Sequence, residues 1–518
     1  MLMKGTAGVY TLLTPCAVDS TSLMHGWRNS MRRNPLTACV NLKGWGALFD
    51  RTQDGGILQR NFGGHQYPRL AHVGDRTGLE MIRALQDHGI HQGIEVHMEN
   101  TVVSLLKTGE RVSGAFGYER EKGRFKVFTA KAVVLATGGV GKAYEITSNS
   151  WEYTGDGHSL AYHAGAELID MEFVQFHPTG MVWPPSVRGI LVTEGVRGEG
   201  GVLKNGEGNR FMFDDIPELY LLTRDHVARC IVREVQEGRG SPHGGVFLDI
   251  AWIKEHIRRK LPSMYHQFKE LADIDITQEP MEVGPTTHYI MGGIRVDADS
   301  QMTAVPGLFA AGECAAGLHG ANRLGGNSLS DLLVFGKRAG EYAAKFAEEN
   351  EAVPFDESQI DAIAVHTLKP FENPADDGNA EKMGPYAIQA QLQEKMQELV
   401  GIARSQGSLT QALEEIQNLR QQSESVHAIG NREYNSGWHT ALDLDCLLTV
   451  SEVIALAALE RRASIGAHSR DDYPEKEEPG AGKYNTIVKK TPDGTMEIRR
   501  QPVDELRDDL QEIIDEVG

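Results

Sequence analysis

The sequence has few cysteines and no long apolar run, and each absence argues against particular classes of protein. The five cysteines among 518 residues are odd in number, and no two are spaced as Cys-x-x-Cys. This argues against a disulfide framework or an iron–sulfur site in this chain and favours a reducing compartment. No apolar stretch reaches the roughly 18 residues of a transmembrane helix. The mildly apolar residues 9–18 are broken by Thr, Pro and Cys, so we expect neither a membrane segment nor a signal peptide.

Basic residues are also scarce, at 52 against 72 acidic ones, which gives a net charge of −20. Such a surface repels phosphate backbones, so nucleic acid is not an expected partner. What the chain has in quantity is glycine, with 57 residues, beside a hydrophobic fraction of 40%. Together with the length, this predicts a soluble α/β protein of two to four domains with many tight turns.

Two short apolar runs end in glycine turns, as parallel strands of α/β proteins do. Residues 132–136 are followed by Gly138 and Gly139, and residues 307–313 run through an apolar stretch to Glu313. We predict two buried parallel strands whose turns let a ligand approach the backbone, although ordinary strand-to-helix turns would look the same. A helix is expected over residues 327–346, with Ser328 as a candidate N-cap.

Helical periodicity dominates after about residue 350. Apolar residues recur at helical spacing from Ile388 to Val400, Ser408 and Gln411 form a capping-box pattern, and residues 442–459 form a third amphipathic stretch. These stripes are expected to be ordinary helix core. From Arg470 onward the chain is acidic and contains Pro474 and Pro479, which predicts a tail lying on the surface.

Seven polar clusters lie among glycines, where a plain core would not place them. They occupy residues 61–65, 154–157, 175–180, 191–201, 223–225, 288–293 and 319–329. Each alone is weak, since a histidine beside glycine is more often a turn residue than a ligand. In this order they resemble the flavoprotein subunit of the succinate dehydrogenase/fumarate reductase family, from about Gly44 to Arg470.

The resemblance implies an α/β fold: a split FAD-binding domain with an inserted capping domain, followed by a helical domain and a C-terminal tail. The expected boundaries are 43–170 and 286–350 for the FAD-binding domain, 171–285 for the capping domain, 351–470 for the helical domain and 471–518 for an acidic C-terminal segment. Ile465 departs from the family pattern, which usually has arginine there.

The resemblance also implies the site. A C4 dicarboxylate needs several fixed donors, and the residues matching the family's substrate-binding positions are Phe62, His177, Thr193, His288 and Arg323. Arg224 matches the catalytic arginine. Because an arginine pKa lies above 12, Arg224 can transfer protons only through a relay, and Glu194 and Arg197 match that relay. Their spacing alone would suit a surface ion pair.

FAD is the cofactor that the resemblance implies, and no metal site is expected. The matching cofactor-binding residues are Gly138, Gly139, Asp156, Glu313, Ser328 and Leu329. The family's opening strand, glycine turn and helix, which hold the FAD pyrophosphate, are not found in this sequence. FAD binding by the chain as given is therefore expected to be weak.

Residues 1–42 match nothing in the family by inspection, whereas the stretch from Gly44 to Asp50 falls directly into register. Back-translating residues 14–40 and reading two bases later gives a sequence that resembles the missing family segment. We therefore expect residues 1–42 to be an out-of-frame translation without a packed βαβ unit, the alternative being a divergent N-terminus.

The expected function is the flavin-dependent interconversion of succinate and fumarate. Electrons would pass through an iron–sulfur subunit to a quinone, and membrane-anchor subunits would hold the complex on the cytoplasmic face of the cell membrane. The alternatives are an L-aspartate oxidase-like flavoenzyme and an inactive fragment that no longer binds FAD. Gly325 and Gly326, where that oxidase usually has Ala-Ser, favour the dehydrogenase branch.

Overall fold

The structure is a computed structural model that describes residues 35–60, 68–212, 224–254, 256–374, 383–474 and 483–503, without the side chains of 35–37. Within these ranges the helices are α3 (Pro35–Gly44), α4 (Thr77–His91), α5 (Asp156–Ala164), α6 (Gly195–Gly198), α8 (Arg224–Gln236), α9 (His256–Lys260), α10 (Pro262–Ala272), α11 (Asn327–Glu349), α12 (Glu357–Glu372), α13 (Pro385–Leu399), α14 (Gln406–Ser423) and α15 (Ser436–Glu460).

The strands form small sheets rather than one large one. A parallel pair consists of β6 (Val133–Leu135) and β13 (Leu308–Ala310), and a meander of β3 (Asn100–Thr108), β4 (Arg111–Glu119) and β5 (Arg124–Thr129). An antiparallel sheet has the order β8 (Val174–Met181), β11 (Met281–Ile290), β10 (Val246–Asp249) and β9 (Val202–Lys204). A second has the order β12 (Gly293–Ile294), β7 (Leu168–Ile169), β16 (Tyr484–Lys490) and β17 (Met496–Pro502). Two short pairs are β1 (Gln59–Arg60) with β2 (Leu70–Ala71) and β14 (Ala403–Arg404) with β15 (Ser469–Arg470).

The two glycine-terminated apolar runs do form the predicted parallel pair, with Val134 opposite Phe309. All of β13 is buried, but Val134 on β6 is 39% exposed, so the expectation that both strands are buried is wrong for β6. The start of α5 lies close to the end of β6. A Cβ added to Gly157 would lie only 2.1 Å from the Thr137 hydroxyl. The chain therefore brings the first glycine turn and α5 to one place.

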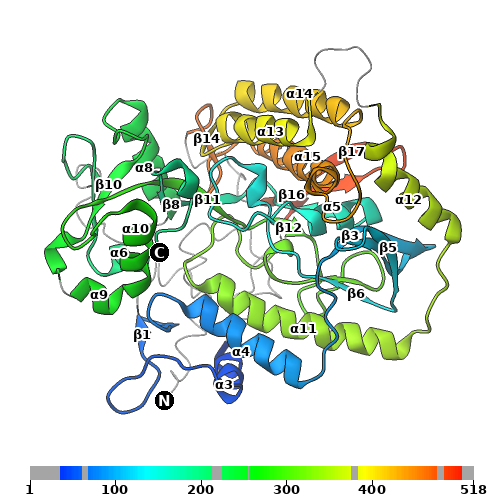
Figure 1. Cartoon of the computed structure of the whole chain (residues 1–518), viewed down its shortest axis with the longest axis horizontal. Coiled ribbons are helices and arrows are strands. Elements are labelled where there is room, and N and C mark those ends of the chain that lie inside the picture. Colours follow the sequence, from blue (N-terminus) through cyan, green and yellow to red (C-terminus); the bar gives the residue numbers. More distant parts are fainter. Residues whose placement is uncertain are drawn as a thin grey trace.

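The antiparallel sheet β8–β11–β10–β9 has an apolar core of its own. This core includes Met181 on β8, Leu248 on β10 and Ile231 on α8, each fully buried. In Figure 1 the green elements β10, α8, α9 and α10 accordingly group together on one side of the molecule. A segment inserted between the two halves of the parallel pair thus folds around its own core.

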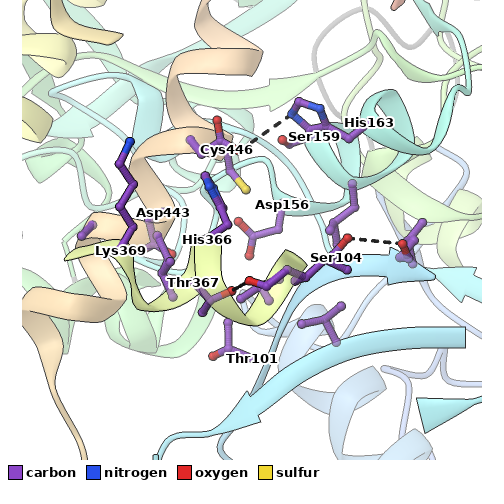
Figure 2. A pocket seen from close by; sticks show the side chains of 18 of the residues that line it. Thr101, Ser104, Asp156, Ser159, His163, His366, Thr367, Lys369, Asp443 and Cys446 are labelled. Atoms are coloured by element: carbon purple, nitrogen blue, oxygen red, sulfur yellow. Dashed lines mark hydrogen bonds and ion pairs between the residues drawn. The ribbon is translucent and has the colours of Figure 1, made fainter. Parts of the chain in front are cut away.

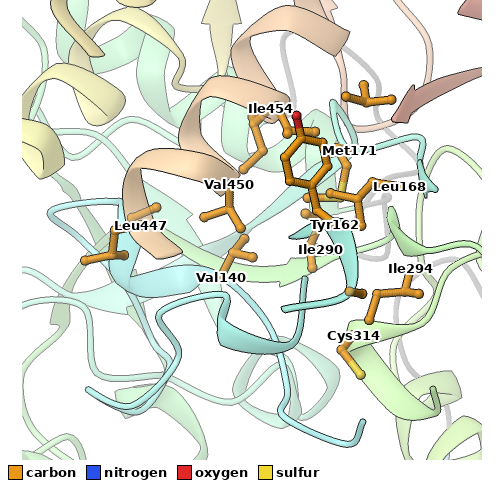
Figure 3. Packing of buried hydrophobic residues seen from close by; sticks show 14 of the residues in the cluster. Val140, Tyr162, Leu168, Met171, Ile290, Ile294, Cys314, Leu447, Val450 and Ile454 are labelled. Carbon is orange, nitrogen blue, oxygen red and sulfur yellow. The ribbon is translucent and has the colours of Figure 1, made fainter. Parts of the chain in front are cut away.

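The largest core joins strands of the predicted FAD-binding part to the helices after residue 350. Side chains of α15, including Leu447, Val450 and Ile454, pack against Val140 after the first glycine turn and Ile290 on β11 (Figure 3). The predicted stripe from Ile388 to Val400 lies on α13 and is buried in the same cluster. The helical half of the chain is therefore packed directly on the strands, and its stripes are core as expected.

Two predicted helix starts are wrong in detail. Helix α14 begins with Ser405, not Ser408, as its N-cap, and the capping box joins Ser405 to Ser408. Helix α11 is capped by Gly326 in the left-handed region, with no side-chain cap. The Ser328 hydroxyl instead accepts a hydrogen bond from Arg323, at 3.0 Å, because that arginine is held beside the helix start.

The C-terminal part also differs from the predicted surface tail. Strands β16 and β17 form a hairpin, and β16 pairs with β7, so that residues Asn485 to Val488 are buried. Tyr, Thr, Ile and Val in β16 are residue types that favour strands, a signal that the acidic composition around it obscured.

Residues 1–34 lie outside the described part of the chain, so most of the predicted out-of-frame segment does too. Its last residues form helix α3, whose Leu42 is 1% exposed and packs with Phe49 and Met81. The expectation of irregular chain is therefore wrong for residues 35–42, and that of poor packing is wrong for Leu42.

Candidate functional site

The site is built on two adjacent strands whose polar side chains are buried. On β8, Gln175, His177 and Thr179 alternate along one face, and each is at most 1% exposed. On β11 the register shifts between Thr287 and Tyr289, which leaves His288 in a bulge. The rings of His177 and His288 consequently lie with their centroids 5.2 Å apart.

Both histidines are held in their neutral form. Burial, and then the charges of Arg224 and other arginines, bring the pKa of His177 and the pKa of His288 well below the usual value. His177 Nε2 lies 3.0 Å from the Val192 carbonyl, which requires the proton on that nitrogen and leaves Nδ1 without a hydrogen bond among the described residues. One ring atom of His177 thus remains available to a ligand.

Arg224 stands at the first position of α8, and each of its three guanidinium nitrogens donates a hydrogen bond. Its Nε and Nη2 donate to Glu194 Oε2 at 2.9 and 2.8 Å, and its Nη1 donates to Gln175 Oε1 at 3.1 Å. All three side chains are buried, so the charge-assisted hydrogen bonds fix the guanidinium in position.

Glu194 and Arg197 are buried as well, at 3% and 5% exposure, which excludes a surface ion pair. Glu194 is the N-cap of the short helix α6, and Arg197 lies on that helix three residues on. Arg197 Nη2 is 3.8 Å from Glu194 Oε1, on the opposite side of the carboxylate from Arg224. The sequence therefore folds into a buried row of cation, carboxylate and cation.

Arg323 approaches from the loop before α11. Its Nη2 donates to the same Gln175 Oε1, at 3.0 Å, and its guanidinium carbon lies 4.3 Å above the Tyr289 ring. Burial, together with the nearby positive charge of Arg224, lowers its pKa to about 10. Arg323 Nε has no hydrogen bond among the described residues, so this buried cation retains a donor for an anion.

Gln175 is the residue that sequence reasoning missed. Its carbonyl oxygen accepts from both Arg224 and Arg323, and its Nε2 donates to Asn322 Oδ1 and to the Arg323 carbonyl, each at 2.7 Å. It therefore holds two like charges at a fixed separation. The signal was present, because Gln175 lies two residues before His177 and so faces the same side of a strand.

The other two predicted substrate residues are less informative. Thr193 is half-buried next to Glu194, and its hydroxyl accepts from the Gly195 amide at 3.3 Å. Phe62 lies outside the described residues. The structure thus brings together His177, His288, Arg224 and Arg323, with Thr193 next to the relay carboxylate.

The predicted cofactor residues Gly138, Gly139 and Glu313 meet where the two parallel strands end. A Cβ on Gly139 would lie 2.2 Å from Glu313 Oε1, so only glycine fits there, and Gly138 adopts a φ of 76°. Burial raises the pKa of the Glu313 carboxyl to about 7, and Oε1 accepts one backbone hydrogen bond, from Ile290 at 3.1 Å. A carboxylate with this spare acceptor capacity fits a polyhydroxyl group such as the ribityl or ribose part of FAD.

Ser328 and Leu329 lie at the start of α11. The Ser328 hydroxyl accepts from Arg323, while Leu329 packs on the cluster around Phe49. Ser328 thus joins the predicted cofactor residues to Arg323, a predicted substrate residue, and the side chain of Leu329 is part of a core.

Asp156, the remaining predicted cofactor residue, lines a separate cavity of about 740 Å³ between β3, α5, α12 and α15 (Figure 2). Asp443 of α15 lines the same cavity, and its pKa is raised to about 7, by burial first and then by the charge of Asp156. Burial likewise raises the pKa of Asp156. Two acids that are both costly to ionise therefore share this wall.

The raised pKa of Asp443 predicts that the folded protein loses stability as pH rises. The folded pKa of Asp443 exceeds its unfolded value near 4, so the folded state loses stability as pH rises between about 4 and 7. We expect the gain of Asp443→Asn in free energy of unfolding over the wild type to be about 2–3 kcal/mol larger at pH 8 than at pH 5. Urea denaturation at both pH values measures this. The exposed Asp445→Asn, two residues along α15, is the matched control and should change neither value by more than about 0.5 kcal/mol. An equal Asp443→Asn effect at both pH values would contradict the assignment.

Two families match the chain. The FAD binding domain family matches residues 17–329, a match that begins inside the segment set apart by the sequence, and the family "Fumarate reductase flavoprotein C-term" matches residues 389–508. A chain of the fumarate reductase (CoM/CoB) of Methanothermobacter marburgensis is 44% identical over 436 residues, which cover 84% of this chain and 78% of that protein. The succinate dehydrogenase flavoprotein subunit of Coxiella burnetii is 38% identical, with 86% and 79% covered.

Solved structures agree. Mycobacterium smegmatis Sdh1 in complex with UQ1 has a TM-score of 0.86 at 49% identity, covering 97% of this chain and 86% of that one. A variant of FrdA from E. coli quinol fumarate reductase has a TM-score of 0.89 at 30% identity, covering 98% and 88%. The described helices include none long and apolar enough to cross a membrane. With this fold and these relatives, the chain belongs to the succinate dehydrogenase/fumarate reductase flavoprotein subunit family, whose members are oxidoreductases with a split FAD-binding domain, an inserted capping domain and a helical domain.

Proposed function

We propose that this chain interconverts succinate and fumarate. The observation that carries the proposal is the buried row Arg224–Glu194–Arg197 beside a second buried arginine, Arg323, with Gln175 bridging the two arginines nearest each other. Two fixed cations suit the two carboxylates of a C4 dicarboxylate, and the acid–base row suits transfer of one proton.

Reduction of fumarate adds a hydride to one alkene carbon and a proton to the other. A flavin bound at Gly138, Gly139, Asp156, Glu313 and Ser328–Leu329 would supply or accept the hydride. Arg323 holds one carboxylate through its unused donor, and the neutral imidazoles of His177 and His288 orient the other end of the substrate with Thr193 and Phe62.

Arg224 delivers the proton from its guanidinium, and Glu194 Oε2 replaces it. The hydrogen bonds support this order, because both Arg224 donors to Glu194 end on one oxygen while the other oxygen lies nearer Arg197. The fixed positive charge of Arg224 also stabilises negative charge that develops on the substrate as the hydride is added.

The wider assembly is part of the same proposal. Electrons would leave the flavin through an iron–sulfur subunit for a quinone, with membrane-anchor subunits holding this chain to the inner face of the cell membrane. The separate core around β8–β11 would belong to the capping domain, which closes over the substrate.

Steady-state assays on the flavin-loaded protein test the reaction, with flavin content determined first from visible absorbance. Fumarate reduction with an artificial electron donor and succinate oxidation with an artificial acceptor should both proceed. L-Aspartate, offered in parallel, should not be oxidised. Oxidation of L-aspartate without fumarate reduction would replace the proposal by the aspartate oxidase reaction.

Arg323→Ala is expected to weaken malonate binding by about 2–4 kcal/mol, because it removes one partner of a desolvated charge pair. Calorimetric titration measures this without turnover. Arg323→Lys is the matched control: it retains the charge but loses the fork that contacts Gln175 and Ser328, so its loss should be smaller. Unchanged malonate affinity in Arg323→Ala would remove Arg323 from the substrate site.

A further inference from the structure

A second cavity of about 540 Å³ opens on the other side of the buried row, and we call it the Arg197 pocket. It lies among α6, β9, β10 and the turn that follows β10, within the green group of elements in Figure 1. The side chains that give it its character are those of Arg197, Lys204, Arg210, Asp249 and Trp252. Apart from Arg197, which belongs to the proposed proton relay, none of them has a role in the proposed function.

Arg197 is the innermost of these side chains and is incompletely paired. It is only 5% exposed, and its Nε and Nη2 make no hydrogen bond among the described residues. The ion pair described for it, to Glu194, is long at 3.8 Å, because Glu194 directs its other oxygen to Arg224. Burial accordingly lowers the pKa of Arg197. A buried guanidinium in this state stabilises any anion that reaches it.

The rest of the pocket is positive too. Lys204 and Arg210 add two cations, and Asp249 is the one carboxylate on the wall. The Asp249 carboxylate is already paired with a cation, because Lys204 Nζ donates to Asp249 Oδ2 at 2.7 Å. Among the described residues that line the cavity, three are cations and one is a carboxylate, in a chain whose net charge is −20, which favours a small anion as its occupant.

Trp252 forms a preset wall of the pocket. Its ring is 64% exposed, and its Nε1 donates to the Gly200 carbonyl at 3.1 Å. Gly200 has a φ of 102°, and a Cβ there would lie 2.6 Å from the ring. The indole therefore stands over the glycine turn that follows Arg197, where it can report on a ligand.

We propose that the Arg197 pocket binds a small dianion, inorganic phosphate or a short dicarboxylate, and that the bound dianion restrains proton transfer through Arg197. The second half rests on the proposed function, in which Arg197 is the outer member of the proton relay. An anion paired with Arg197 holds its guanidinium charged and in place, so Glu194 is reprotonated more slowly.

Binding is tested without turnover through Trp252 fluorescence, at constant ionic strength set by chloride. Inorganic phosphate and malonate are titrated separately, because the two arms distinguish the sources of the same charge. We expect a saturable change in fluorescence with at least one of the two ions, and no such change in the Trp252→Phe variant. Lys204→Gln and Arg210→Gln should each weaken binding about tenfold, as loss of one charged partner does. Lys204→Arg should restore it.

Arg323→Ala separates this pocket from the substrate site and should leave the Trp252 titration unchanged. A signal that disappears in Arg323→Ala, or that survives in Lys204→Gln together with Arg210→Gln, would overturn the proposal. So would the absence of saturation with both ions, which identifies the pocket as a plain solvent cleft.

The relay half is tested by kinetics. The bound ion should lower kcat for fumarate reduction without raising KM, and Lys204→Gln should relieve this inhibition while keeping normal activity in its absence. If the fluorescence titration shows that the ion binds but kcat is unaffected, the proposal that the ion restrains the proton relay is wrong. If the protein reduces no fumarate at all, the proposed function fails while the binding result stands.

Discussion

Arg224→Lys should lower kcat for fumarate reduction by roughly three to four orders of magnitude, with little change in malonate affinity. A lysine retains the charge but has one nitrogen in place of three, so it cannot contact Glu194 twice and Gln175 once as Arg224 does. The proton donor then stands in the wrong place relative to the substrate. Single-turnover and steady-state rates on flavin-loaded protein measure the effect.

Arg229→Lys, five residues along the same helix, is the matched control. Arg229 is more exposed and pairs with Asp225 at 3.1 Å, outside the buried row, so its replacement should leave kcat near that of the wild type. Near-normal kcat in Arg224→Lys, with the loss confined to KM, would make Arg224 a carboxylate clamp rather than the proton donor.

Arg461→Met is expected to destabilise the protein by about 3–5 kcal/mol, because it leaves two buried acids without their cation. Arg461 is 1% exposed and directs Nε to Glu172 and Nη2 to Asp170. Burial, and then the charge of Glu172, already raise the pKa of Asp170 to about 7. Without the arginine this pKa rises further.

The sign of the pH dependence follows from that shift. An acid whose folded pKa is raised costs stability as pH rises from its unfolded pKa to its folded one, so the Arg461→Met defect should be larger at pH 8 than at pH 5. Urea denaturation at both pH values checks it. Arg461→Lys, which keeps a charge beside both acids, should lose much less. A loss below about 1 kcal/mol for Arg461→Met at both pH values would show that the acids are neutralised without Arg461.

The candidate site residues could be singled out from the sequence because the clusters are local, and their roles stay predictions. His177, Glu194 and Arg197, Arg224, His288 and Arg323 each stand in a short glycine-rich segment whose composition marks it, and the structure places them on a strand, a helix start, a bulge or a loop as these segments allow. The contacts between the clusters could not be predicted, since they join residues far apart in the sequence. Gln175 is the clearest case: its role depends on Arg224 and Arg323 meeting at one carbonyl oxygen.

The sequence by itself determined the parallel strand pair, the helices after residue 350, the family and the candidate site residues. Periodicity and local motifs suffice for these because they depend only on residues close together in the chain. Only the tertiary structure decided burial and pairing. In the structure Glu194 and Arg197 are buried in a row instead of forming a surface pair, and Ser328 contacts Arg323 instead of capping its helix. Val134 is exposed, and residues 484–490 are part of a sheet. Burial is a property of what surrounds a residue, and no local pattern specifies those neighbours.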